Sequence, residues 1–334
     1  PDLRSSARLS FARARQAEFE GRAQAGQAEL RAAIATIEGR EVSEIAALRS
    51  ALADSISADA PEAALAERTQ ALADAEHFWG PNHPQTANYA YKLGAALLDR
   101  DAPRAAALLE RAVAIWTQVH HRPHPDLGTA RMTLARLALR AGELDQAEAH
   151  ARALARIYAN TLAPEHPDQG DPELLLAIIE GVRGDRASAL EHAERAVALW
   201  EPVLAPDSAK LVSMRSEVAA NLLALGRLDE AEHAYAVVLE HAPDSIATRV
   251  GLVELQLRRD RLEAADASLR GAEALADPGP HAFSLALLRA LVDLRRGRLE
   301  PSTIAALTKA GETSPFTAAQ VDAWVDELAV TESE

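Results

Sequence analysis

The sequence predicts an all-α fold, a right-handed superhelical α-solenoid of about eight antiparallel helix pairs with a C-terminal capping helix. Three observations predict this fold. A short phrase recurs along the chain, the apolar residues inside each period have helical spacing, and no segment alternates apolar and polar residues as a half-buried strand does.

The recurring phrase is a Gly or Asp, a few polar residues and then an Ala-rich segment. Successive copies are 42, 41, 42, 42, 34 and 37 residues apart, and they begin at Asp59, Asp101, Gly142, Gly184, Gly226, Asp260 and Gly297. Because Gly suits the position after a helix, this phrase predicts the turn between the two helices of a pair.

A second marker runs in phase with the first, at steps of 41, 42 and 42 residues. Its copies are Asn82-His83-Pro84, Pro123-His124-Pro125, Glu165-His166-Pro167 and the degraded Asp207-Ser208-Ala209. Proline suits the first turn of a helix, where its missing N–H is not needed. Each period therefore predicts two helices and two turns.

Apolar residues within a period recur every three or four positions. After His124 they include Leu127, Ala130, Leu134 and Leu137. Apolar residues make up 48% of the chain but aromatic residues only 4%, so the core depends on Ala and Leu. Small side chains at the crossings predict close helix packing.

The markers resemble those of a known family. The 42-residue period with Gly80-Pro81-Asn82-His83-Pro84 and Ala163-Pro164-Glu165-His166-Pro167 resembles the tetratricopeptide repeats of kinesin-light-chain type. The 34-residue step from Gly226 to Asp260, with Leu222, Ala231, Tyr235 and Pro243 in phase, is similar to the ordinary tetratricopeptide consensus.

This resemblance implies a chain that binds peptides or partner helices on a concave face formed by the first helix of each pair. Many members hold the ligand backbone with a pair of Asn residues. The matching positions here are Tyr91-Lys92, Met132-Thr133, Leu174-Leu175 and Ser216-Glu217, so that pair is missing.

We expect residues 1–313 to form the solenoid. Residues 1–40 and 41–80 are expected to be divergent pairs, 81–240 kinesin-light-chain-type repeats and 241–313 shorter repeats, followed by the capping helix at 314–330 and a tail at 331–334. The start at Pro1 suggests a fragment of a longer protein.

Composition excludes several classes of function. The chain of 334 residues carries 35 Lys and Arg against 50 Asp and Glu, a formal net charge of −15. Such acidity argues against binding nucleic acid or anionic membranes. The sequence also contains no apolar run of about 18 residues, the length that would predict a membrane-spanning helix. Without Cys there is no disulfide or thiolate metal site. We expect a cytoplasmic protein.

No catalytic motif is present: the sequence has no Gly-rich phosphate loop, Gly-x-Ser-x-Gly element or His-Glu-x-x-His motif. His120, His121 and His124 have a spacing that could hold a metal, but repeat geometry and a helix end explain them. His150, His192 and His233 occupy equivalent repeat positions. We therefore expect a fragment without catalysis, metal or cofactor.

Charge is distributed unevenly, because residues 81–140 carry +4 within an otherwise largely acidic chain. On the predicted first helices of this band, the candidate groove residues are Tyr91, Lys92, Arg131, Met132, Arg136 and Arg140. They predict a site for an acidic, partly apolar peptide. The alternative is a solvated basic surface whose side-chain stems pack over Leu and Ala.

Each terminal helix has two interpretations. Val321, Trp324, Val325 and Leu328 form an apolar stripe that predicts a cap over the last repeat, or an internal ligand for a groove. The first helix is a repeat helix or, because of its arginines, a basic amphipathic membrane contact.

The sequence thus predicts a protein-interaction scaffold that binds a protein or peptide on its concave face. The alternative is a regulatory or sensory C-terminal arm of a larger bacterial signalling enzyme, such as a serine/threonine protein kinase, that recruits substrates or mediates self-association. A third interpretation, a stand-alone enzyme, would need the histidines to be catalytic.

Overall fold

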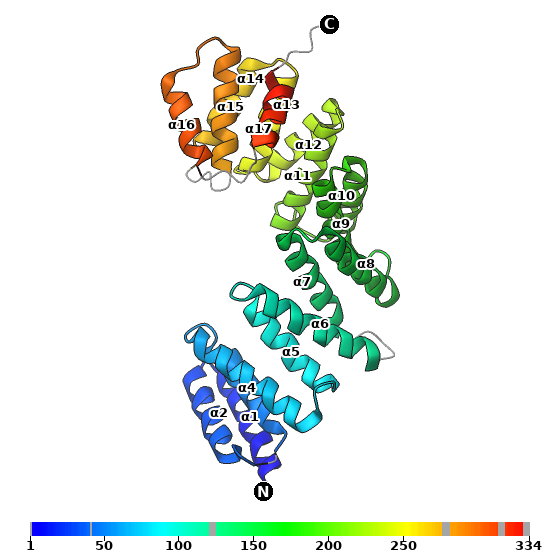
Figure 1. Cartoon of the computed structure of the whole chain (residues 1–334), viewed down its shortest axis with the longest axis vertical. Helices are drawn as coiled ribbons and strands as arrows, with labels where there is room; N and C mark the ends of the chain where they lie inside the picture. The colour runs from blue at the N-terminus through cyan, green and yellow to red at the C-terminus, as the bar shows by residue number, and fades with distance from the viewer. Residues whose placement is uncertain (1, 41, 120–124, 276–280, 313–317, 330–334) are drawn as a thin grey trace. The chain divides into compact units, whose positions relative to one another are not determined.

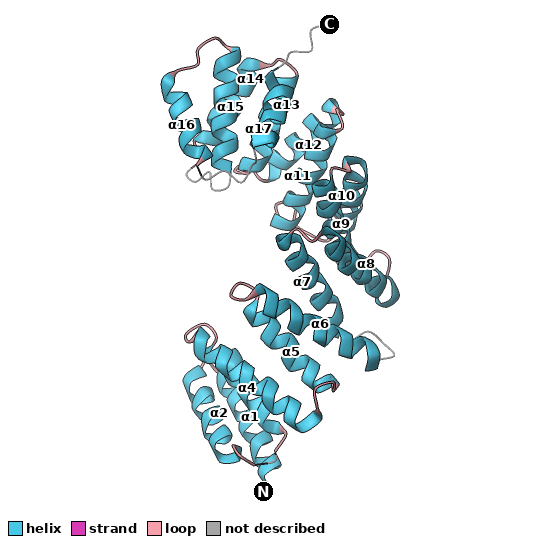
Figure 2. Ribbon diagram, in the orientation of Figure 1, coloured by secondary structure: helices cyan, strands magenta, loops and turns pink. Residues whose placement is uncertain are grey.

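The computed structural model describes residues 2–40, 42–119, 125–275, 281–312 and 318–329 (Figure 1). These residues are mainly helical, and no β-strand occurs among them (Figure 2). Contacts divide the chain into two compact units, Pro1–Thr161 and Leu162–Glu334.

The first unit consists of four helix pairs. Its helices are α1 (Leu3–Phe19), α2 (Ala23–Ile37), α3 (Glu44–Ile56), α4 (Pro61–Trp79), α5 (Pro84–Leu97), α6 (Ala102–Val119), α7 (Pro125–Ala141) and α8 (Leu144–Thr161). Each odd-numbered helix packs against the next, and the first helices α1 and α3 also contact each other.

The second unit contains four further pairs and one more helix. Its elements are the 3-10 turn η1 (Pro167–Gln169), α9 (Gly170–Arg183), α10 (Arg186–Trp200), α11 (Ala209–Ala224), α12 (Leu228–His241), α13 (Ile246–Arg258), α14 (Leu262–Glu273), α15 (Ala282–Arg295), α16 (Pro301–Gly311) and α17 (Ala318–Ala329). The all-helical solenoid of helix pairs is confirmed. The division into divergent, kinesin-light-chain-type and shorter repeats stays a prediction.

The second sequence marker caps the helix that follows it. The Nδ1 atom of His83 accepts a hydrogen bond from the backbone N–H of Gln85 at 3.1 Å, and Nδ1 of His166 accepts one from Asp168 at 3.2 Å. In the degraded copy, Ser208 Oγ accepts from Leu211 N–H at 3.4 Å. These side chains satisfy N–H groups that the first helical turn leaves free.

The first marker ends helices in more than one way. Gly184 follows α9 in the left-handed conformation with φ 87°, and Asp260 has φ 54° in the equivalent place after α13. Asp101 acts differently, because its Oδ1 accepts from Arg104 N–H at 3.1 Å and caps the start of α6. At this repeat position Gly184 and Asp260 therefore end the preceding helix, whereas Asp101 caps the start of the following one.

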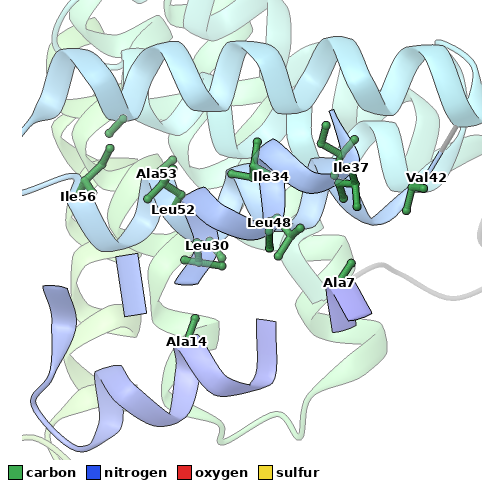
Figure 3. Close-up of a cluster of buried hydrophobic side chains, with 14 residues drawn as sticks. Ala7, Ala14, Leu30, Ile34, Ile37, Val42, Leu48, Leu52, Ala53 and Ile56 are labelled. Carbon is green, nitrogen blue, oxygen red and sulfur yellow. The ribbon is translucent and has the colours of Figure 1, made fainter. Parts of the chain in front are cut away.

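The core of the first four helices is built from aliphatic side chains (Figure 3). Leu30 and Ile37 of α2 lie in one cluster with Leu48 of α3, and Ala7 and Ala14 of α1 face them. The buried guanidinium of Arg49 forms ion pairs with three carboxylates, those of Glu38, Glu67 and Asp74. Such compensation lets a charged residue be buried.

Large aromatic side chains sit at one repeat position, 42 residues apart: Trp116, Tyr158 and Trp200. Tyr158 of α8 lies against Gly128 of α7, and Trp200 of α10 lies against Gly170 of α9. A Cβ added at Gly170 would be 2.5 Å from Trp200 Nε1, which donates to Pro167 O at 2.8 Å. The ring can occupy this place only because the facing residue has no side chain.

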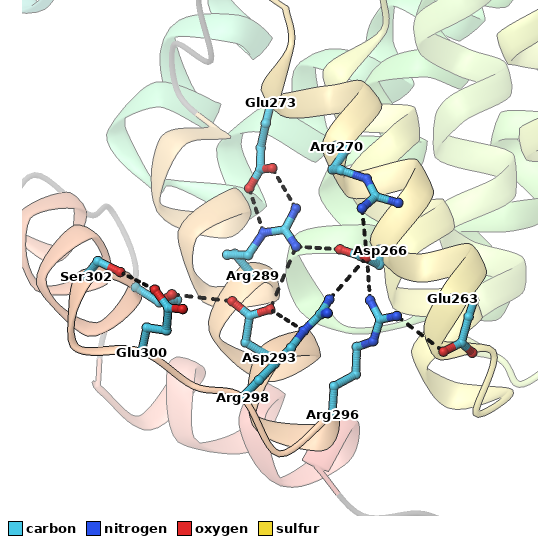
Figure 4. A network of polar contacts seen from close by, with 11 residues as sticks. Glu263, Asp266, Arg270, Glu273, Arg289, Asp293, Arg296, Arg298, Glu300 and Ser302 are labelled. Carbon is cyan, nitrogen blue, oxygen red and sulfur yellow. Dashed lines mark hydrogen bonds and ion pairs between the residues drawn. The ribbon is translucent and has the colours of Figure 1, made fainter.

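A buried carboxylate ties the last two helix pairs together. The carboxylate of Asp266 in α14 forms ion pairs with four arginines (Figure 4). The distances from its oxygens to the guanidinium nitrogens are 2.6 Å for Arg289, 3.2 Å for Arg270 and 3.3 Å for Arg298, and Arg296 is the fourth partner. The hydrogen bond from Arg289 is the main cause that lowers the pKa of Asp266 from 3.8 to about 2.

The final helix α17 packs on α13 and α15, with Leu328 fully buried in their apolar cluster. This contact agrees with the predicted cap. None of the helices in the described part of the chain combines the length and apolar character that crossing a membrane requires.

Replacing Gly170 by alanine should lower stability by about 1–3 kcal/mol, because the new methyl overlaps the Trp200 ring. The matched control is Gly181→Ala on the same helix, where the nearest atom would be 3.7 Å away. This control should gain up to about 1 kcal/mol, since alanine favours the helix. Urea unfolding followed by circular dichroism measures both, and equal effects would contradict the close-contact argument.

Replacing Asp266 by asparagine should destabilise the protein by about 3 kcal/mol at pH 7, since four arginines lose a buried anion. The folded pKa is depressed, so the wild type keeps this stabilisation above pH 4 and loses it as the pH falls toward 2. Thermal unfolding of the variant should depend less on pH in that window.

Glu263→Gln is the control for that measurement, because Glu263 pairs with Arg296 while its side chain is 85% exposed. We expect it to change stability by less than about 1 kcal/mol. A wild-type unfolding temperature that stays constant from pH 4 to pH 2 would contradict the assignment to Asp266.

Candidate interaction sites

A hollow of about 250 Å³ opens on the first-helix face of α1, α3 and α5. Lys92 lines it, and its Nζ donates to Ser50 Oγ at 2.9 Å and pairs with Asp54 at 3.1 Å. Asn88 lies one turn away on the same face, and its buried Oδ1 accepts no hydrogen bond from the described residues. The neighbouring Tyr89 is enclosed enough for burial to raise its pKa to about 12.

A second, smaller hollow of about 150 Å³ lies between α7 and the end of α5. Arg136, Arg140, Thr133 and Leu137 line it from α7. Arg140 Nη1 pairs with Asp99 at 3.2 Å. The Arg136 side chain is exposed and forms no ion pair with any described residue. We call this site the α7 hollow.

The remaining sequence candidates border neither hollow. Tyr91 packs its ring 5.6 Å from that of Trp116 within the α5/α6 pair, and burial raises its pKa. Arg131 points to α8, where its Nη1 lies 3.0 Å from His150 Nδ1. Met132 is half-buried. The structure thus brings Arg136 and Arg140 together and places Lys92 in a different hollow.

The buried His150 connects two helix pairs as a neutral group. Its Nε2 lies 3.0 Å from Glu110 Oε1 and its Nδ1 lies 3.0 Å from Arg131 Nη1. Burial is the main cause that lowers the pKa of His150, so a proton on Nε2 donates to Glu110 while Nδ1 accepts from Arg131. This role is structural.

His192 also has a carboxylate partner. His192 Nδ1 lies 2.7 Å from Glu173 Oε2, in a group that Arg195 completes. His120, His121 and His124 fall outside the described residues. Within the described ranges, no three His, Asp or Glu side chains come together as metal ligands would.

Several cations of the basic band are matched by carboxylates from the preceding repeat. Arg100 pairs with Glu62, Arg111 with Glu76, and Lys92 with Asp54. Local charge therefore overstates the positive character of this surface, and Arg104 and Arg136 are exposed cations that form no ion pair with any described residue.

A hollow of about 410 Å³ in the second unit lies on the first-helix face of α11 and α13. We call it the α11–α13 hollow. Glu217 and Ser216 of α11 line it together with Glu254 and Gly251 of α13, while Tyr235 reaches it from α12. The surrounding protein raises the pKa of Glu217, although solvent still reaches the side chain.

No sequence pattern predicts this hollow. In the sequence, Ser216 and Glu217 stand at the positions of the missing Asn pair, and the charge pattern favours basic residues elsewhere. The available signal was Tyr235 in the second helix of a repeat with Gly251 in the following first helix.

Comparisons with known proteins agree with this architecture. Residues 127–168 and 168–244 match two models of the tetratricopeptide repeat family. Comparison with curated protein sequences finds no match.

Solved structures share the fold at low sequence identity. Nearly identical TPR-like repeats from Podosopora anserina, described as a kinesin light chain, are 24% identical with a TM-score of 0.52, over 60% of this chain and 98% of theirs. A tetratricopeptide repeat protein from Parabacteroides merdae is 14% identical with a TM-score of 0.58, over 84% and 99%.

The apo form of RapI reaches a TM-score of 0.65 at 10% identity, over 92% of this chain and 85% of its own. At these identities the likeness concerns the fold alone. The two family-model matches show that the chain contains tetratricopeptide repeats, at residues 127–244.

Proposed function

We propose that this chain holds a segment of a partner protein against the first-helix faces of its repeats. The tetratricopeptide fold supports a protein-interaction scaffold in general. The observation that carries the more specific proposal is that each unit has a hollow between first helices of neighbouring pairs, lined by both polar and apolar side chains. Such mixed linings suit peptide side chains.

One structural neighbour is consistent with this use of the fold. A Rap protein in complex with Competence and Sporulation Factor has a TM-score of 0.52 and 13% identity to this chain. That complex shows the fold with a bound factor in another protein.

An acidic segment is the ligand that the α7 hollow suits. Arg136 presents an exposed guanidinium there with no ion pair among the described residues, and Leu98 and Leu137 supply apolar surface beside it. A carboxylate of the partner would pair with Arg136 in bidentate geometry while an adjacent apolar side chain contacts the leucines. Tyr91, Arg131 and Met132 would support this surface from behind.

The remaining expectations differ in their support. A cytoplasmic location belongs to this proposal, since a partner-binding scaffold would meet its partner there. The alternative of an arm of a larger bacterial signalling enzyme, with substrate recruitment or self-association, has no observation in its favour on the described residues, so we do not propose it.

Arg136→Glu should weaken binding of acidic peptides about tenfold or more, because it replaces attraction by repulsion. The test selects peptides from a random library on the immobilised full chain and measures their affinities by fluorescence anisotropy.

The matched control for this test is Arg104→Glu, which makes the same charge change at an exposed position near the start of α6, outside the α7 hollow. It should leave affinity within about twofold. Equal losses in both variants would show a non-specific charge effect and contradict the site.

A further inference from the structure

The C-terminal helix α17 lies on first helices of the second unit. It packs on α13 and α15, which are the first helices of two neighbouring pairs (Figure 1). The last second helix, α16, keeps an exposed surface, because none of its residues Pro301–Gly311 is buried and Ile304 is 51% exposed. A helix that served only to seal the last pair would cover that surface.

The contact of α17 with α13 and α15 is apolar. Leu328 is fully buried, and Val321 and Val325 are half-buried in the same cluster, which includes Val253 of α13 and Leu288 of α15. The three residues of α17 have the spacing i, i+4 and i+7, with which an amphipathic helix anchors in a groove. The contact therefore has the form of a ligand helix on its binding face.

One buried cation receives the carboxyl end of α17. The Arg295 side chain is only 8% exposed, and its Nη1 donates to Leu328 O at 3.2 Å and to Leu257 O at 2.7 Å. A cation is favourable at a helix carboxyl end, where the last carbonyls have no N–H partner within the helix. Arg295 also pairs with Asp260 at 2.7 Å. The guanidinium therefore keeps two partners when α17 leaves.

The other attachments of α17 are weak. Among the side chains that the structure describes, no ion pair joins α17 to the rest of the second unit, and Asp322 and Asp326 are exposed. The last two helix pairs, by contrast, are tied together through Asp266 and its four arginines. A segment with few buried apolar contacts opens at a lower free energy than the core. This difference favours opening of α17 while α13–α16 stay folded.

We propose that α17 is a built-in ligand of the first-helix face of α13 and α15, and that an amphipathic helix of the partner replaces it there. The partner's helix carries apolar residues at i, i+4 and i+7 and ends where a carbonyl reaches Arg295. This inference rests on the proposed function, because it names the kind of segment that one first-helix face binds.

The test measures whether this face accepts α17 from outside the chain. A fluorescent peptide of residues 318–329 is titrated with the full chain, either wild type or Leu328→Ser, and anisotropy reports binding. In wild type the chain's own α17 competes at a high effective concentration. The variant loses the buried leucine of its own helix, so we expect it to bind the peptide at least tenfold more tightly than wild type does.

Two controls carry the same change of leucine to serine. Leu9→Ser alters a leucine of α1 that is 50% exposed, and this chain should bind the peptide as weakly as wild type. A peptide that itself carries Leu328→Ser should bind the Leu328→Ser chain at least tenfold more weakly, because it lacks the side chain that is buried against α13 and α15. Equal binding of both peptides would overturn the inference.

Hydrogen exchange of the Leu328→Ser chain distinguishes a ligand from a structural cap. We expect the amides of α13 and α15 to keep their wild-type protection while those of α17 exchange at least tenfold faster. Loss of protection throughout α13–α16 would show that α17 stabilises the repeats themselves and would overturn the inference. Equally weak binding of the 318–329 peptide to wild type and Leu328→Ser would also overturn it.

The random peptide library then tests the partner's pattern. Peptides that bind Leu328→Ser but not wild type should carry apolar residues at this spacing and be displaced by the 318–329 peptide, and peptides without these properties would overturn the partner helix. Peptides that bind the α7 hollow should bind both chains equally, so a failure confined to the 318–329 peptide overturns this inference alone. Failure of every library peptide on both chains would overturn the proposed function, and the partner helix with it.

Discussion

The structure depends on how closely the two helices of each pair approach. Alanines at the crossings, such as Ala90, Ala130, Ala193 and Ala231, are fully buried, so backbones meet with one methyl group between them. Where a large ring is required at the end of a second helix, the facing residue is Gly128 or Gly170. A chain with few aromatic side chains can therefore still fill its core to the density that stability requires.

This close packing also creates the candidate sites. Some first helices of neighbouring pairs contact each other, as α1 contacts α3 and α11 contacts α13, and two of the hollows open beside these contacts. Tyr235 shows the dependence directly, because its hydroxyl reaches the α11–α13 hollow only by lying against Gly251. The residues that hold the repeats together thus also determine which groups face a ligand.

Most of the fold could be predicted from the sequence, because period, caps and apolar spacing are local. The His-Pro marker predicted helix starts, and His83 and His166 do cap them. The orientation of each helix was harder to predict. Tyr91 and Lys92 are adjacent on α5, so their side chains leave the helix in directions about 100° apart. Lys92 lines a hollow while Tyr91 contacts Trp116, a choice that tertiary packing makes.

Net charge by segment was a poor guide to binding because this chain pairs its charges between repeats. Cations meet anions 38 residues back at Lys92–Asp54, 41 back at Arg140–Asp99 and 35 back at Arg295–Asp260. Pairs so far apart in sequence depend on how one repeat stacks on the next, and a segment count cannot detect them.

What a partner meets is the charge left after this pairing. In the part of the chain that the structure describes, Arg136 and Glu217 are two such groups, each in a hollow of its own unit. Both side chains are exposed, so water and salt screen their charges, and affinity there also depends on the apolar contacts beside each charge.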